Sequence, residues 1–266
     1  MSKEIIIKTD RTTNHVYLND KKSSVPTVFL HGFTGSHRSW DQVLEKLNYA
    51  AITLDLPGHG KSIFNDLNID YSIDDWCEDF TQILDFLKVD KLNLCGYSMG
   101  GRLAIAFASK YPQKINRLIL ESTSYGIESK EEREERFQED LKLCEIIESD
   151  LPQFVQKWEN SSLFSNQGKR NELQFKRQRE DRLSHNPAQL SKALKTFSQG
   201  HMRPYEAEFS KFNFPISIIN GSDDFKYKLI GKRMSKINKQ AIQHVVNNAN
   251  HNVHLESTDA FINLIK

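Results

Sequence analysis

Serine, aspartate and histidine, which together can activate a hydroxyl group, occur in a suggestive order along this chain of 266 residues. Ser98 lies in Gly96–Gly100, which fits the pattern G-x-S-x-G of a nucleophile on a sharp turn between a strand and a helix. Asp224 ends the turn Gly221–Asp224 after a later apolar segment, and His251 follows the next apolar segment. In such a set the imidazole accepts the serine proton, and the carboxylate orients the imidazole. The order therefore predicts a catalytic triad of Ser98, Asp224 and His251.

Neighbouring residues leave alternatives open for the acid and the base. Asp223 stays a rival, although the spacing G-x-x-D favours Asp224 and makes Asp223 a turn residue. His254 is the fallback for His251, and His31 is interpreted as a structural hydrogen bonder in its turn. Five other histidines are expected at the surface or in strands: His15, His37, His185, His201 and His244.

Two backbone N–H groups are candidates for an oxyanion hole. Met99 opens the helix that follows Ser98, so its N–H lies near the serine. The turn His31-Gly32-Phe33 follows another apolar segment, and the N–H of Phe33 is the second candidate. Together they could stabilise negative charge on a substrate oxygen.

The segments that must position these groups alternate between strands and helices. Ser72 can cap a helix whose apolar face contains Trp76, Phe80, Ile83, Leu84 and Leu87. Such alternation predicts the α/β class, with a mostly parallel central sheet flanked by helices. The predicted strands are residues 28–30, 51–54, 92–95, 117–120, 216–219 and 241–246.

The alternation breaks between Tyr125 and Glu206, where the sequence is helical and rich in charge. We expect residues 125–206 to form an inserted helical cap, or lid, that shapes a substrate pocket. Residues 1–124 and 207–266 are then the two parts of one core. Most charges of the run Lys130–Arg136 are expected on a solvated helix face.

Composition argues against several other classes of function. A formal net charge of +1 gives no long-range attraction to nucleic acid or to an anionic membrane, so any basic chemistry must be local. No segment approaches the roughly 20 apolar residues that insertion across a membrane needs, and the apolar run at 5–7 is too short for a signal peptide. The scattered Cys77, Cys95 and Cys144 argue against disulfides and a zinc site, and Cys95 is expected in the core. These features predict a cytoplasmic protein without metal or organic cofactor, and they leave the oligomeric state open.

Residues 96–102 resemble the same segment of the 2-succinyl-6-hydroxy-2,4-cyclohexadiene-1-carboxylate (SHCHC) synthases of menaquinone biosynthesis, which have the α/β-hydrolase fold. The resemblance covers nearly the whole chain. It implies a lyase that removes a ring proton and eliminates pyruvate from a small tricarboxylate, 2-succinyl-5-enolpyruvyl-6-hydroxy-3-cyclohexene-1-carboxylate. Further matching segments are residues 31–36, 55–62, 131–133 and 221–227, of which 55–62 is shared with many hydrolases.

The resemblance also implies which residues bind the substrate. Planar guanidinium groups bind carboxylates best, so arginines are the expected partners of a tricarboxylate. Asn250 stands where the family usually has glycine, and Ser222-Asp223 is unusual in the acid turn. The matching arginines are Arg102, Arg136 and Arg182, with Arg177 and Arg179 as alternatives to Arg182, and the matching aromatic residues are Tyr97, Trp158 and Phe164.

Two other functions would use the same residues. A carboxylesterase or C–C bond hydrolase would act through an acyl-enzyme and would depend little on Arg102. A ligand-binding protein with an idle hydrolase fold would be stabilised by its ligand without turning it over. A complete triad argues against the second alternative, because binding alone does not require all three groups.

Overall fold

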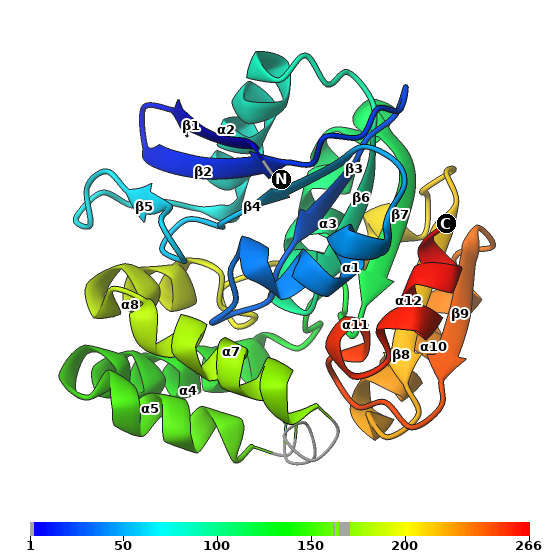
Figure 1. Ribbon diagram of the computed structural model, residues 1–266. Coiled ribbons are helices and arrows are strands. Elements are labelled where there is room, and N and C mark those ends of the chain that lie inside the picture. The colour runs from blue at the N-terminus through cyan, green and yellow to red at the C-terminus, as the bar shows by residue number, and fades with distance from the viewer. Residues whose placement is uncertain (1–2, 162, 165–170) are drawn as a thin grey trace.

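The sheet that carries the site has six neighbouring parallel strands, in the spatial order β4-β3-β6-β7-β8-β9 (Figure 1). β2 pairs antiparallel with β4, while β1 and β5 both pair antiparallel with β2. The computed structural model describes residues 3–161, 163–164 and 171–266. The strands are β1 (Lys3–Lys8), β2 (Thr12–Leu18), β3 (Thr27–Leu30), β4 (Ala51–Leu54), β5 (Ile63–Phe64), β6 (Leu92–Tyr97), β7 (Ile115–Glu121), β8 (Ile216–Gly221) and β9 (Ala241–Val246).

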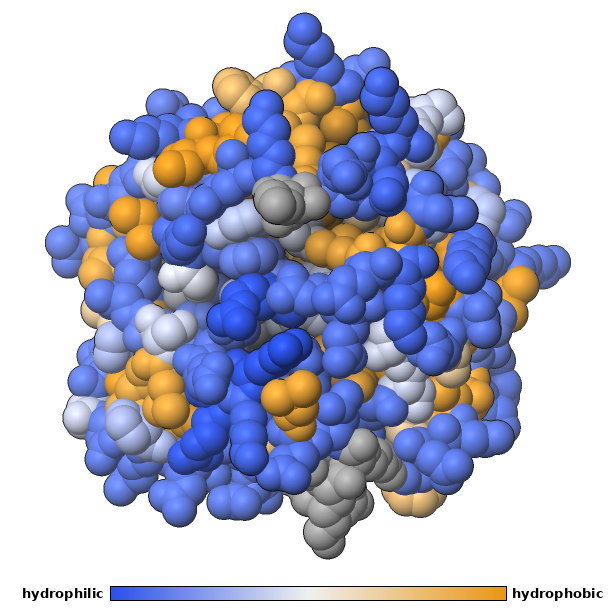
Figure 2. Space-filling view, viewed as in Figure 1, coloured by the Kyte–Doolittle hydropathy of each residue, from blue (hydrophilic) through white to orange (hydrophobic). Residues whose placement is uncertain are grey.

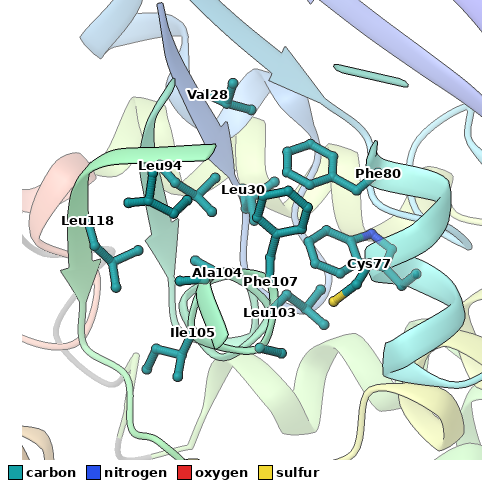
Figure 3. Close-up of a cluster of buried hydrophobic side chains, with 14 of the residues drawn as sticks. Val28, Leu30, Cys77, Phe80, Leu94, Leu103, Ala104, Ile105, Phe107 and Leu118 are labelled. Carbon is teal, nitrogen blue, oxygen red and sulfur yellow. The ribbon is translucent and has the colours of Figure 1, made fainter. Parts of the chain in front are cut away.

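Helices cover both faces of this sheet. α2 (Ile73–Phe86), α3 (Met99–Lys110) and α10 (Phe225–Ile237) contribute side chains to a core cluster on one face. Figure 3 shows Phe80 and Cys77 of α2 beside Phe107 and Leu103 of α3, packed against Leu30 of β3. On the other face lie the 3₁₀ segment His37–Trp40 and the helices α1 (Asp41–Lys46), α11 (Val253–Glu256) and α12 (Thr258–Ile265).

Local sequence explains where these elements begin. Ser72 caps α2 through a capping box with Asp75, and the apolar face predicted for this helix is the buried one. β3 and β4 are buried at every residue because helices cover both faces, which is why they are short continuous apolar runs. Ser257 precedes α12, but its side chain makes no capping hydrogen bond.

Helices inserted between β7 and β8 form a separate layer at the lower left of Figure 1. α4 packs on α8 and α5, and these three helices share an apolar cluster that includes Phe154 and Leu190. The predicted α/β class with a mostly parallel sheet is confirmed. The inserted helices are α4 (Lys130–Ser149), α5 (Leu151–Glu159), α7 (Glu172–Ser184), α8 (Pro187–Thr196) and the short α9 (Glu206–Phe209).

Within the described ranges, no helix combines the length and the apolar character needed for a transmembrane span. Figure 2 shows hydrophilic residues over most of one face and apolar residues in separate patches.

The N-terminal hairpin of β1 and β2 was not among the predicted strands. Its outer strand is mostly exposed, so it lacks a strong apolar pattern.

Three histidines meet where the inserted helices contact the core. The ring of His59 lies 5.0 Å from that of His31 and 5.5 Å from that of His185. All three are buried, so the expectation that His185 is a surface or strand residue was wrong. His31 bonds to the carbonyl of Gly32 and to the N–H of Leu56, which agrees with a structural role. Because burial disfavours the charged form, the pKa of His31 falls to about 4, and the pKa values of His59 and His185 are also lowered.

Acid should therefore unfold this protein cooperatively. In the unfolded chain a histidine binds a proton below about pH 6.5, whereas in the folded protein His31 does so only near pH 4. The contribution of its lowered pKa to the free energy of unfolding is therefore fully present above pH 6.5 and is lost as the pH falls from 6.5 to 4. Each such histidine contributes about 1.4 kcal/mol per pH unit. Urea unfolding at several pH values measures this slope. His185→Gln should reduce this slope, because the pKa of His185 is lowered by burial, whereas the exposed His201→Gln should leave it unchanged. Equal slopes in all three proteins would contradict the assignment.

Candidate active site

Ser98 lies at the bend between β6 and α3, with φ of 52° and ψ of −109°. A non-glycine residue in this region carries backbone strain of about 1–3 kcal/mol, which the surrounding packing must offset. The bend is tight: a Cβ at Gly100 would collide with the carbonyl of Leu30, and one at Gly96 would collide with the backbone of Gly100. Glycines on both sides are thus required, and the bend presents the serine side chain beyond the carboxyl end of the sheet.

The imidazole of His251 lies between the serine and a carboxylate. Its Nδ1 is 2.7 Å from Oδ2 of Asp224, and its Nε2 is 3.0 Å from Oγ of Ser98. Because a carboxylate accepts the Nδ1 proton, Nε2 is left to accept the proton of the Ser98 hydroxyl. Oδ1 of Asp224 accepts a hydrogen bond of 3.3 Å from the N–H of Tyr227, at the start of α10. This geometry is that of a serine activated by general base assistance.

The structure distinguishes the predicted pair from its rivals by position. Asp223 is exposed and accepts a hydrogen bond from the hydroxyl of Ser222 at 2.9 Å. His254 instead donates from Nδ1 to Oε2 of Glu121 at 2.7 Å, and both residues are completely buried. It is therefore Asp224 and His251 that the structure places in line with the serine.

The turn that carries Phe33 packs directly against the bend of Ser98. A Cβ on Gly32 would lie 2.7 Å from the ring of Tyr97 and 3.5 Å from Cβ of Ser98. Met99 is the first residue of α3, immediately after the serine. The backbone segments that carry both oxyanion candidates thus border the serine, while an oxyanion hole formed by their N–H groups stays a prediction.

Arg102 lies one helical turn after Ser98, and its N–H donates to the carbonyl of Ser98. Its Nη2 donates to the carbonyl of Phe197 at 2.7 Å, while its buried Nε has no hydrogen-bond partner among the described residues. No carboxylate in the described part of the chain forms an ion pair with it. The pKa of Arg102 is lowered to about 10, mainly by desolvation and also by the nearby charge of Arg136. A desolvated guanidinium without an ion-pair partner is stabilised when an anion joins it.

Arg136 and Arg182 differ from Arg102 because each already has a carboxylate partner. Arg136 pairs with Asp140 at 3.0 Å. Arg182 is buried and its Nη1 pairs with Oε1 of Glu159 at 3.0 Å, and the other carboxylate oxygen of Glu159 is bound by Arg179. The remaining alternative, Arg177, is exposed. Of the three arginines considered for the third substrate-binding position, Arg182 is therefore the one whose side chain is buried.

Aromatic rings surround the imidazole of His251. The Tyr97 ring lies 5.4 Å from it and the Phe164 ring 6.1 Å. Trp158 stands 5.6 Å from Phe33 and 5.8 Å from Phe164, so it belongs to the same wall. A small cavity of about 20 Å³ beside this wall is lined by Phe33, Tyr97, Phe164 and Arg182, among others. The aromatic rings thus form one wall beside the imidazole of His251.

Comparison with known proteins places this arrangement in a family. The sequence model of the protein family described as α/β hydrolase fold matches residues 25–258 of this chain. A Bacillus subtilis (strain 168) protein provisionally named SHCHC synthase is 36% identical over 241 residues, which cover 90% of this chain and 88% of that protein. This chain belongs to the SHCHC synthase family of α/β hydrolases. The SHCHC synthase of Yersinia pseudotuberculosis serotype O:1b (strain IP 31758) is 28% identical, with 88% of this chain and 83% of that one covered. The solved structure of MenH from S. aureus superposes with a TM-score of 0.89, at 30% identity and 97% coverage of both chains.

Tyr227 is a site residue of this SHCHC synthase-type enzyme that sequence reasoning did not single out. Its ring lies 4.7 Å from that of His251, and its hydroxyl interacts electrostatically with Arg102 and Arg136. Burial raises the pKa of Tyr227, so the phenol stays protonated and can donate a hydrogen bond. Its position three residues after Asp224, at the N-terminal turn of α10, was the available signal.

Proposed function

We propose that this member of the family is an SHCHC synthase, a carbon–oxygen lyase that eliminates pyruvate from 2-succinyl-5-enolpyruvyl-6-hydroxy-3-cyclohexene-1-carboxylate. The observation that carries this proposal is Arg102. A hydrolase of simple esters would have no use for a half-buried guanidinium without a carboxylate partner one helical turn from its serine. A substrate with three carboxylates supplies the missing anion.

In the proposed mechanism, Ser98 and His251 act together as the base. His251 takes the hydroxyl proton, and the serine oxygen removes a proton from the ring of the substrate. The electron pair of that C–H bond forms the new ring double bond, and the C–O bond to the enolpyruvyl group breaks. The departing enolate becomes pyruvate when its carbon gains a proton. Asp224 stabilises the imidazolium that forms in between.

The N–H groups of Phe33 and Met99 are proposed to stabilise the enolate oxygen. Preorganised donors of this kind contribute about 10²–10³ in rate each, because they act where charge develops. Proton transfer by a positioned base contributes about 10²–10⁴. Neither role requires a covalent intermediate on Ser98 or a bound cofactor.

Arginines on two sides of the triad are proposed to orient the three carboxylates. Arg102 and Arg136 approach from the side of Tyr227, and Arg182 approaches from the side of Tyr97 and Phe164. Arg182 would have to share its charge between Glu159 and the substrate. Because Arg136 and Arg182 belong to residues 125–206, we propose that this segment is a cap domain whose closure completes the binding site. Tyr97, Trp158 and Phe164 would line the space between them.

Pyruvate release tests this proposal. The purified protein is incubated with the enolpyruvyl substrate, pyruvate is measured with a coupled dehydrogenase, and hydrolysis of a simple activated ester is measured in parallel. We expect pyruvate and the cyclohexadiene product in equal amounts, with much slower ester cleavage. Rapid ester cleavage without pyruvate would instead identify a hydrolase, and substrate-induced stabilisation without any product would identify a binding protein.

The compartment is also a proposal. Cys77, Cys95 and Cys144 are free thiols in the structure, and all three are buried. Burial raises the pKa of each thiol, so none is a reactive thiolate. This pattern suits a reducing compartment, and we propose the cytoplasm.

A further inference from the structure

The charge of this chain is distributed very unevenly near its C-terminus. Residues 225–255 contain no aspartate or glutamate, although the whole chain has a formal net charge of only +1. All lysines and arginines of this segment lie on α10 or in the turn after it. They are Lys226, Lys228, Lys232, Arg233, Lys236 and Lys239.

One side of α10 combines this charge with exposed apolar residues. Phe225, Leu229, Lys232 and Lys236 are spaced by four, three and four residues, so they form one stripe along the helix. All four are exposed, and the exposed fractions of Phe225 and Leu229 reach 69% and 63%. The opposite side, with Tyr227, Gly231 and Met234, packs against the sheet. We call these four residues the α10 stripe.

The lysines of the stripe are available to an external anion. Arg233 is paired with Glu128 at 3.3 Å, and Lys226 faces a cleft whose other wall carries glutamates of α4. By contrast, Lys232 and Lys236 form no ion pair with any residue that the structure describes. Lys228 flanks the stripe, and its ammonium group lies 4.5 Å from the centre of the Phe225 ring. Phe225 and Leu229 thus share one side of the helix with two lysines, Lys232 and Lys236, that have no ion-pair partner among the described residues.

We propose that the α10 stripe is a docking surface for an anionic phospholipid bilayer. Lysines would contact lipid phosphates, while Phe225 and Leu229 would enter the boundary between head groups and acyl chains. A second copy of the chain fits this surface poorly, because two equally basic stripes would repel each other. A nucleic acid would be attracted by the lysines but would leave Phe225 and Leu229 without a partner. The inference does not depend on the proposed function, and it concerns peripheral contact rather than insertion across the bilayer.

Vesicle co-sedimentation tests this proposal. The full chain is mixed with vesicles of phosphatidylglycerol and phosphatidylcholine, or of phosphatidylcholine alone. We expect at least about tenfold stronger partitioning to the anionic vesicles, and a decrease with added salt. Failure of the wild-type protein to bind, or equal binding to both kinds of vesicle, would overturn the proposal.

Paired variants separate the two parts of the stripe. Lys232→Glu/Lys236→Glu should weaken binding to anionic vesicles by at least about tenfold. Phe225→Ala/Leu229→Ala should weaken it by about tenfold while keeping the salt dependence. The control Lys22→Glu/Lys91→Glu changes the net charge equally, at exposed lysines near the amino ends of β3 and β6, and should bind as wild type. An equal loss of vesicle binding in this control would overturn the assignment. Unchanged vesicle binding by Phe225→Ala/Leu229→Ala, together with binding of the protein to a polynucleotide, would also overturn it. Thermal denaturation verifies that each variant is folded.

Discussion

Ser98→Ala should lower kcat for pyruvate release by at least about 10³-fold, because it removes the oxygen that takes the ring proton. Affinity for the intact substrate should change little, since the serine hydroxyl contributes no charge to binding. The alanine keeps the packing of the bend between β6 and α3, so the protein should unfold at nearly the same urea concentration. Single-turnover kinetics and calorimetric titration with the substrate separate these two effects.

Variants of the other two triad positions provide matched controls for this result. His251→Ala should cause a loss similar to that of Ser98→Ala, because residues that act as one unit are not additive. Asp224→Asn should also reduce kcat strongly, whereas Asp223→Asn, on the exposed neighbour, should stay close to wild type. If Asp223→Asn were the damaging change, or if Ser98→Ala kept wild-type turnover, the assignment of the site would be wrong.

Arg102→Ala should lower kcat/KM for the tricarboxylate by about 10- to 150-fold, mostly through KM, since one hydrogen-bonded charge pair contributes about 1.5–3 kcal/mol. Any residual ester hydrolysis should be unaffected. Arg102→Met should in addition raise the free energy of unfolding by about 1 kcal/mol, because it replaces a half-buried cation that has no carboxylate partner among the described residues.

This combination of lower affinity and higher stability distinguishes a binding residue from a structural one. A purely structural arginine would lose stability on replacement, because its contact with the carbonyl of Phe197 would be its main contribution. Arg177→Ala is the control, since Arg177 is an exposed arginine of the same inserted segment. Unchanged KM for Arg102→Ala would remove the main support for a tricarboxylate substrate.

Much of the fold and of the reacting set could be predicted because the signals are local. A serine between glycines after an apolar run indicates the bend, and strands buried on both faces appear as short apolar segments such as Val28–Leu30. The order of Asp224 and His251 after two later strands then follows from the topology. Each of these features is encoded by residues that are close together in the chain, so one sequence is enough to predict them.

Pairings between distant segments could not be predicted in the same way. Glu121 and His254 form a buried pair across 133 residues, and His185 of the inserted segment joins His31 and His59 of the core. Nothing in the local sequence of His185 distinguishes it from an exposed histidine. The pairing of Arg182 with Glu159 was likewise invisible, because it depends on how two helices of the cap pack.

In the proposed reaction, Ser98 acts as a base and pyruvate leaves without a covalent enzyme intermediate. Intact-protein mass spectrometry during turnover, with pyruvate measured in the same sample, addresses both parts at once. We expect pyruvate to accumulate over many turnovers while the mass of the protein stays that of the free chain, and we expect Ser98→Ala to release none. An adduct on Ser98 that forms and decays at the rate of turnover, or pyruvate release at the wild-type rate by Ser98→Ala, would contradict it.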